Sequence, residues 1–168
     1  MRAIPLTRGK ETVVDDDDYE FLIRTKWSAG IWEDGPRPIR NSKTLNGKRH
    51  QIFMHREIWE HHYGSIPKGM EIDHINGDRL DNQLHNLRLC TRSQNMANQR
   101  KKAPHSSIFK GVCYYKRDER WQAYIQQDGR QYHIGYFDSE VGAAKAYDIE
   151  ARKRFGEFAA LNLNTGGI

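Results

Sequence analysis

The sequence predicts an α+β fold built in two parts, and three features of the 168 residues predict it. Short apolar runs alternate with polar residues at the spacing of β-strands, and glycine, proline and asparagine separate these runs. The segment 139–155 instead places its apolar residues at helical spacing. Apolar residues make up only 37% of the chain, so two small cores are expected rather than one large core.

The first 50 residues, and the few that follow them, are expected to form short strands and turns. Three runs have a strand-like composition, namely Thr12–Val14, Tyr19–Ile23 and Ile52–Met54. Asn46-Gly47 stands between two extended runs, which is the pattern of a hairpin turn. The acidic run Asp15–Asp18 is open to two interpretations, a solvated turn or a metal-binding cluster, and a run of like charges favours the solvated turn.

The middle of the chain is expected to fold as helix, strand, long loop, strand and helix. His55–His62 has the length of a short helix, and Gly64 and Pro67 close it. The two strands are Glu71–Ile75 and Leu87–Thr91. Thr91 or Ser93 can cap the helix that follows, which runs to about Gln99.

The second half begins after a polar, basic stretch at 100–108, which is the predicted linker. Three antiparallel strands are expected beyond it, at Phe109–Tyr115, Trp121–Gln126 and Gln131–Phe137. Asp128-Gly129 makes the second turn, and Asp138 or Ser139 caps the helix over 139–155. The alternation predicts one sheet face against the helix, with Trp121, Ala123 and Ile125. The opposite face then carries Gln122, Tyr124 and Gln126.

Charge and composition narrow the class of protein. The net charge of +5 is concentrated after residue 95, where it is +4, and a basic surplus suits a polyanionic partner. The two cysteines form no CxxC pair, so we expect neither a disulfide framework nor a structural zinc site. The chain has no apolar run of 18 residues, and no membrane segment is therefore expected.

Four polar residues have the chemistry of phosphodiester hydrolysis, namely Asp73, His74, Asn86 and Asn95. Asp73 offers a carboxylate suited to Mg²⁺, and Asn95 offers a neutral carbonyl oxygen. His74 has an ordinary pKa of about 6.5, so it can accept a proton from water near neutral pH. By residue type alone, an Asp-His pair beside a turn and asparagines on a helix surface are equally open to a structural interpretation.

The stretches MHREIWEHHYG at 54–64 and EIDHINGDRLDNQLHNLRLCTRSQNMANQ at 71–99 resemble the HNH endonucleases of the phage and intron-encoded homing type. The resemblance implies a ββα-metal core over about 54–99, with Asp73 and Asn95 as metal ligands and His74 as general base. It implies that Asn86 ties down the loop and helps to orient the histidine. Asn98 is the alternative to Asn95. His55 and Arg56 resemble a family pair with a phosphate-contacting or, for His55, a packing role.

Residues 106–163 contain the segments KGV, WQAYI, IGYFDSEVGAAKAYD and FAALN, and these resemble the Apetala-type DNA-binding domain of plant ethylene-response factors. The resemblance implies a three-stranded sheet in the major groove with a helix behind it. The implied DNA-facing residues are Lys110, Cys113, Tyr115, Tyr124, Gln126, Gln131 and His133. Phosphate contacts are expected from Lys116, Arg117, Arg120 and Arg130, and from the linker residues Arg100, Lys101 and Lys102.

The sequence therefore predicts a DNA endonuclease of nicking or homing type that uses Mg²⁺, Mn²⁺ or another divalent ion. The expected domains are 1–99, linker 100–108 and 109–163. The expected partner is double-stranded DNA, with no membrane and no obligatory protein partner, in the cytoplasm of a bacterial or phage-infected cell near the nucleoid. The alternatives are a non-catalytic DNA-binding regulator and an RNA-directed nuclease. Deletion of 103–168 is expected to leave a weak, less specific nuclease.

Overall fold

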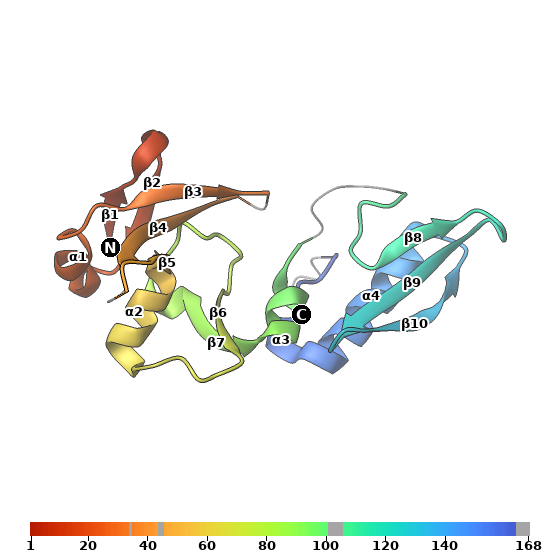
Figure 1. Ribbon diagram of the computed structural model, residues 1–168. Coiled ribbons are helices and arrows are strands. Elements are labelled where there is room, and N and C mark those ends of the chain that lie inside the picture. Colours follow the sequence, from red (N-terminus) through yellow and green to blue (C-terminus); the bar gives the residue numbers. More distant parts are fainter. Residues whose placement is uncertain (34, 44–45, 101–105, 164–168) are drawn as a thin grey trace. The chain divides into compact units, whose positions relative to one another are not determined.

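The computed structural model describes residues 1–33, 35–43, 46–100 and 106–163, and it has the predicted α+β fold (Figure 1). The chain divides into two compact units, Met1–Cys90 and Thr91–Ile168. Small antiparallel sheets and short helices build both units. None of the helices in the described residues has the length and apolar character that crossing a membrane requires.

The first unit starts with a two-stranded antiparallel sheet and a helix. β1 (Arg2–Pro5) pairs with β2 (Glu11–Val14), and η1 (Thr7–Gly9) lies between them. α1 (Asp16–Leu22) follows directly. The predicted strand at Tyr19–Ile23 was therefore wrong. Three aspartates in the first turn of α1 interact favourably with the helix dipole, and this local preference for a helix outweighs the strand-like composition.

The acidic run at 15–18 is also not the solvated turn that was predicted. Asp15 accepts a hydrogen bond from the backbone N–H of Leu84 at 2.7 Å, which ties the start of α1 to a distant loop. Asp18 is only 1% exposed and lies 2.8 Å from His62 Nε2. Within the described residues, no group of three or more His, Cys, Asp or Glu residues could hold a metal ion. Asp15 and Asp18 therefore make contacts within the fold.

A three-stranded antiparallel sheet comes next, in the order β3 (Ser28–Trp32), β4 (Gly35–Lys43) and β5 (Arg49–Phe53). The predicted hairpin around Asn46-Gly47 joins β4 to β5, with Lys43 opposite Arg49, although residues 44–45 of that prediction lie outside the described residues. α2 (Met54–Tyr63) continues directly from β5 and ends at Gly64, as predicted. These elements bring α2 toward the strand that carries Asp73 and His74.

The first unit ends with the predicted strand–loop–strand arrangement. β6 (Met70–His74) and β7 (Leu87–Thr91) form a two-stranded sheet, and the long loop between them contains η2 (Leu84–Asn86). One apolar core lies under these elements, and its most buried members include Ile4, Val14, Leu22, Trp27, Met54, Ile58, Ile72 and Leu87. Because Ile72 of β6 and Leu87 of β7 belong to this core, their packing holds both strands in place.

The second unit has the predicted sheet with one long helix. Its sheet has the order β10 (Arg130–Phe137), β9 (Arg120–Gln127) and β8 (Val112–Tyr115), and α4 (Glu140–Phe155) packs on it. Ser139 accepts a hydrogen bond from Gly142 N at 3.1 Å and caps α4, as predicted. Ala123 and Ile125 are buried on the helix side, again as predicted.

α3 (Arg92–Asn98) groups with the second unit by its contacts. The sequence placed this helix in the first domain and put the boundary at 100–108. Residues 101–105 of that linker lie outside the described residues, so the boundary at 100–108 stays a prediction. The short 3-10 turn η3 (Gly156–Phe158) follows α4 and contacts α3.

Candidate active site

The sheet of β6 and β7 positions Asp73 and His74. The contacts that join the strands include those from Cys90 Sγ to Glu71 O, from Arg88 to Asp73, and from Ile75 N to Asn86 O. As the residue number rises along β6, the number of its partner on β7 falls, so the two strands are antiparallel. Asp73 and His74 lie at the end of β6, where the long loop begins, and both are only 6% exposed.

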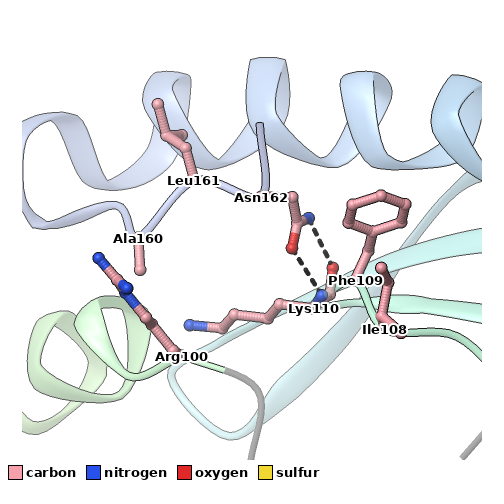
Figure 2. Close-up of a pocket in the computed structure, with 7 residues that line it drawn as sticks. All are labelled: Arg100, Ile108, Phe109, Lys110, Ala160, Leu161 and Asn162. Atoms are coloured by element: carbon pink, nitrogen blue, oxygen red, sulfur yellow. Dashed lines mark hydrogen bonds between the residues drawn. The ribbon is translucent and has the colours of Figure 1, made fainter. Parts of the chain in front are cut away.

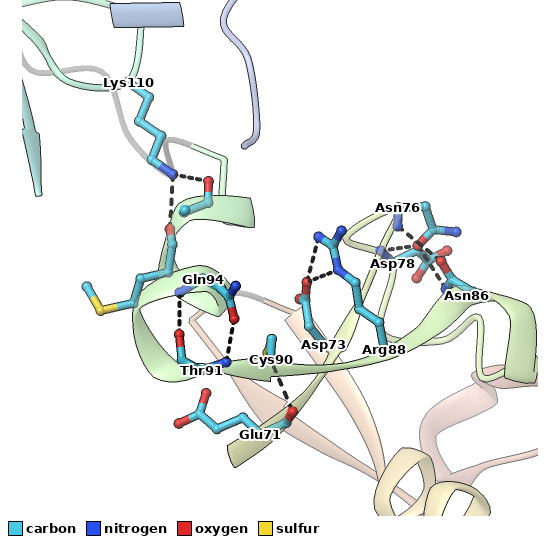
Figure 3. Close-up of polar contacts among 12 residues, drawn as sticks. Glu71, Asp73, Asn76, Asp78, Asn86, Arg88, Cys90, Thr91, Gln94 and Lys110 are labelled. Atoms are coloured by element: carbon cyan, nitrogen blue, oxygen red, sulfur yellow. Dashed lines mark hydrogen bonds and ion pairs between the residues drawn. The ribbon is translucent and has the colours of Figure 1, made fainter. Parts of the chain in front are cut away.

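The carboxylate of Asp73 is held by a guanidinium from the facing strand. Arg88 Nε and Nη2 lie 3.1 and 3.0 Å from Asp73 Oδ2 (Figure 3). Both side chains are largely buried, so this is a charge-assisted contact in a partly desolvated place. Arg88 was not among the residues predicted from the sequence. Its cross-strand position opposite Asp73 follows only from the register of the two strands.

His74 is held through its Nε2 atom by Asn82. The distance from His74 Nε2 to Asn82 Oδ1 is 3.1 Å, and the Asn82 side chain is fully buried. Asn82 was not among the predicted site residues either. The signal that could have found it is the Asp-Asn pair at 81–82, in the middle of the motif between the two strands.

The contacts around Asn82 fix the orientation of its amide group. Asn82 Nδ2 donates to Thr12 Oγ1 at 2.8 Å and to Arg79 O at 3.1 Å. Thr12 Oγ1 donates its own proton to Leu80 O at 2.7 Å, so it must accept from Asn82. The amide oxygen of Asn82 therefore faces His74 and accepts a hydrogen bond from Nε2–H. In the neutral imidazole, this leaves the lone pair on Nδ1.

Burial lowers the pKa of His74, and the hydrogen bond to Asn82 and the charge of Asp73 oppose this only in part. His55, at the start of α2, lies beside it with ring centroids 5.0 Å apart in an edge-on arrangement. Burial and, to a lesser extent, His74 lower the pKa of His55 well below its ordinary value. Both imidazoles are therefore neutral at pH 7, and His74 can accept a proton there.

Asn86 closes the loop between the two strands. Its Oδ1 accepts from Asn76 N at 3.0 Å, and its Nδ2 donates to Asn76 Oδ1 at 3.1 Å (Figure 3). Nδ2 also donates to Asp81 O at 2.8 Å. These bonds connect both ends of the loop that carries Asn82. Asn86 thus lies where it can hold the loop, and Asn82 makes the hydrogen bond to the imidazole ring.

Asn95 lies on α3, in the second unit. A capping box fixes the start of this helix, since Thr91 Oγ1 accepts from Gln94 N at 3.2 Å and Gln94 Oε1 accepts from Thr91 N at 2.8 Å (Figure 3). Asn95 and Asn98 are both half-buried on the helix. The cap places Asn95 in the second turn, in a regular helical conformation.

The candidate DNA-facing residues of the second unit share one sheet face. In the register of β9 and β10, Tyr124 pairs with His133, and Gln126 pairs with Gln131. Tyr115 of β8 pairs with Arg120 on the same face. Tyr136, which the sequence analysis did not include, adds its ring 4.8 Å from His133 and 5.5 Å from Tyr115.

The remaining candidate contacts are dispersed. Lys116, Arg117 and Arg120 are exposed at the β8–β9 turn, Arg56 is exposed on α2, and Arg100 is exposed after α3. Lys101 and Lys102 lie outside the described residues. Lys110 is not on the outer sheet face that was predicted for it. It precedes β8, and its ammonium donates to backbone carbonyls of α3.

Comparisons with known proteins identify the first part of the chain. A family model described as HNH endonuclease matches residues 53–97, which include α2, β6, β7 and most of α3. An uncharacterized HNH endonuclease, L560, of Acanthamoeba polyphaga mimivirus is 33% identical over 159 residues, which cover 94% of this chain and 78% of that protein. The chain belongs to the HNH endonuclease family. No solved structure matches it.

Two further relatives resemble different parts of this HNH endonuclease. Protein 3.8 of Escherichia phage T7 is 34% identical over 105 residues, which cover 62% of this chain and 86% of that protein. APETALA2-like protein 2 of Oryza sativa subsp. indica is 42% identical over 59 residues, which cover 35% of this chain and 14% of that protein. The plant protein is thus similar over a short segment only.

Proposed function

We propose that this HNH endonuclease hydrolyses phosphodiester bonds in duplex DNA, uses one divalent cation, and nicks or cuts at specific sites. The observation that carries the proposal is the state of His74. Its Nε2 is engaged by a fully buried Asn82, its ring is neutral at pH 7, and it follows directly after Asp73. This is the arrangement that a general base for water activation needs.

The donor groups fit a hard divalent cation. Asp73 offers a carboxylate, which is paired with Arg88 through Oδ2, so a bound cation would share this carboxylate with the guanidinium. Asn95 offers an amide oxygen, and the family motif is the basis for pairing it with Asp73. Mg²⁺ or Mn²⁺ suits such oxygen ligands and leaves positions for water and phosphate. When bound, the cation would neutralise charge on the phosphate and on the leaving oxygen.

In the proposed reaction, His74 Nδ1 takes a proton from a water molecule. The water oxygen forms a bond to phosphorus while the bond from phosphorus to the leaving sugar oxygen breaks, and that oxygen is protonated from solvent. Asn82 keeps the ring in the reactive tautomer because its Oδ1 accepts a hydrogen bond from Nε2–H. Asn86 holds the loop that carries Asn82, and this keeps the ring in place between turnovers.

We propose that the second unit is an Apetala-type DNA-binding domain that reads the target. A single exposed sheet face with Tyr115, Tyr124, Gln126, Gln131 and His133 supports this, because such a sheet fits the major groove. The two glutamines can pair with adenine. Lys116 and Arg117 at the adjacent turn can contact phosphates, and so can Arg120, Arg56, Arg100 and the linker residues Lys101 and Lys102.

One such catalytic site per chain would cut one strand per binding event. The test uses supercoiled plasmid with Mg²⁺ or Mn²⁺ between pH 7 and 9. The wild-type chain is expected to nick it, and Asp73→Ala and His74→Ala are expected to abolish nicking while DNA binding persists. His85→Ala, at an exposed histidine of η2, is the matched control and should nick normally.

Three outcomes would contradict the proposal. A chain that binds DNA but is inert with every divalent ion would be a DNA-binding regulator. Equal cleavage of RNA and DNA duplexes would indicate an RNA-directed nuclease. This is not expected, because the major groove of an A-form RNA duplex is too deep and narrow for the sheet to enter. Nicking that survives His74→Ala would mean that another group activates the water.

A further inference from the structure

α3 is too short to be stable without support. It has seven residues, and isolated helices shorter than about 12 residues are marginal in water. α3 packs on the apolar core of the second unit through Ala97, which is only 6% exposed. The buried residues that share this cluster are Ile125, Tyr147, Ala151 and Phe155. A backbone hydrogen bond from Ala160 N to Ala97 O, at 3.1 Å, adds a second attachment.

Lys110 makes the third attachment, at the C-terminal end of α3. Its Nζ donates to Met96 O at 3.0 Å, to Ala97 O at 2.6 Å and to Gln99 O at 2.7 Å. The last carbonyls of a helix have no partner within it, and a positive charge there interacts favourably with the helix dipole. One ammonium with three donors thus bonds to three backbone acceptors at this helix end. Figure 3 draws two of these hydrogen bonds.

The backbone of Lys110 is itself fixed to the far end of the unit. Lys110 N donates to Asn162 Oδ1 at 2.6 Å, and Asn162 Nδ2 donates back to Lys110 O at 3.0 Å (Figure 2). Asp148 of α4 accepts from the N–H groups of Asn162 and Leu163 at 2.8 and 2.9 Å. A chain of hydrogen bonds therefore runs from α4 through Asn162 and Lys110 to α3.

The start of α3 is tied to the sheet of the same unit. Asp128, in the turn between β9 and β10, donates its backbone N–H to Ser93 Oγ at 3.1 Å. Both ends of the helix are thus attached to elements of the Apetala-like part.

We propose that Lys110 is a positioning residue of the nuclease, and that the second unit supports the helix that carries Asn95. This inference rests on the proposed function, which takes Asn95 as a metal ligand. It makes residues 106–163 part of the catalytic apparatus as well as a reader of DNA. Burial lowers the pKa of Lys110 to about 8. The ammonium is therefore still protonated at pH 7, and its charge can stabilise the end of α3.

The test compares three variants in the full-length chain. Lys110→Met removes the ammonium and keeps the length of the side chain, Lys110→Arg keeps a cation with several donors, and Lys145→Met removes one charge from an exposed site on α4. Each variant is measured for amide hydrogen exchange in 95–99, for DNA affinity in EDTA, and for the Mn²⁺ concentration that gives half-maximal nicking.

Lys110→Met is expected to exchange the α3 amides about tenfold faster and to need about tenfold more Mn²⁺, with DNA affinity within about twofold of wild type. Lys110→Arg should recover most of both losses, and Lys145→Met should change neither. If Lys110→Met leaves both the exchange rate and the Mn²⁺ requirement unchanged, the inference is overturned. A loss of DNA affinity alone would also overturn it and would make Lys110 the DNA contact predicted from the sequence. If the wild type does not nick at all while the exchange result holds, the proposed function has failed and the structural role of Lys110 stands.

Discussion

At the scale of single residues, one buried amide decides which nitrogen of the neutral His74 ring carries the proton. Asn82 has no freedom to rotate, because both of its N–H groups face acceptors, Thr12 Oγ1 and Arg79 O. The oxygen that remains can only accept, so it selects the tautomer with a proton on Nε2. In the proposed mechanism, Asn82 thereby determines the chemical form of the imidazole that would activate water.

Replacing Asn82 should therefore lower catalysis more than binding. Asn82→Leu is expected to lower kcat roughly a hundredfold, in the range of general-base contributions, and to leave KM for DNA nearly unchanged. Asn82→Asp keeps an oxygen toward Nε2 and should recover part of the rate. Steady-state nicking kinetics measure the loss of kcat. Unfolding followed by tryptophan fluorescence shows whether the variant is still folded. A leucine variant that is folded and nicks at the normal rate would show that Asn82 does not orient the base.

His55 should make the stability of the first unit depend on pH. Burial lowers its pKa well below the ordinary 6.5, so the folded chain stays neutral there while the unfolded chain takes up a proton. The unfolded state then binds more protons, and stability, which is complete above pH 6.5, falls as the pH decreases toward the folded pKa. His74 contributes with the same sign.

The measurement is chemical denaturation at pH 7.5 and pH 5. One group can change the free energy of unfolding by no more than about 1.4 kcal/mol per pH unit. His55→Gln, which does not titrate, should give a smaller difference between the two pH values than the wild type. His50→Gln, at an exposed position of β5, should keep the wild-type difference. Equal slopes in all three chains would mean that His55 does not carry the effect.

At the scale of elements, the strands and helices with clear periodicity were predictable and the irregular ones were not. β6, β7, β9, β10, α2, α3 and α4 follow from alternation, helical spacing and capping residues. α1 was missed because its seven residues are too few for a helical period to outweigh Tyr, Phe, Leu and Ile. The bulge between His133 and Gly135 shifts the alternation of β10 by one residue, which is why Tyr136 was not placed on the outer face.

The candidate site was predictable to a similar degree. Asp73, His74 and Asn86 were named from residue types and from the resemblance to HNH endonucleases, and their roles stay predictions. Arg88 and Asn82 could not be named in this way, since their roles depend on strand register and on how the loop between 75 and 86 is folded. Neither property leaves a periodic trace in the sequence.

The pair of β6 and β7 should depend on the contact between Arg88 and Asp73. Arg88→Met leaves a buried carboxylate without its cation, and breaking such a pair costs about 3 kcal/mol or more of unfolding free energy. Saturating Mg²⁺ should recover part of this loss if Asp73 is a metal ligand. Arg24→Met, at an exposed position, is the control and should lose little in either buffer. Urea denaturation in EDTA and in Mg²⁺ checks this, and an equal loss in both buffers would argue against metal binding at Asp73.

At the scale of the whole molecule, the division of contacts after Cys90 changes what the second unit is expected to do. The sequence alone suggests a nuclease with a separable reader, so that deleting 103–168 leaves weak cleavage. In the structure, α3 has its apolar contact at Ala97, its cap at Lys110 and its tie at Ser93 within the second unit. Removing that unit removes the support of the helix, and cleavage should therefore fall below detection.

A chimera separates loss of the reader from loss of support. Residues 1–100 fused to an unrelated sequence-specific DNA-binding domain should bind the target of that domain and still fail to nick it, because α3 has no core to pack on. The same foreign domain fused to the full-length chain should redirect nicking to the new target, and this is the control for linker geometry. Plasmid nicking and gel-shift binding on the same DNA give both readouts. Efficient nicking by the short chimera would show that α3 folds without the second unit and that residues 106–163 only read DNA.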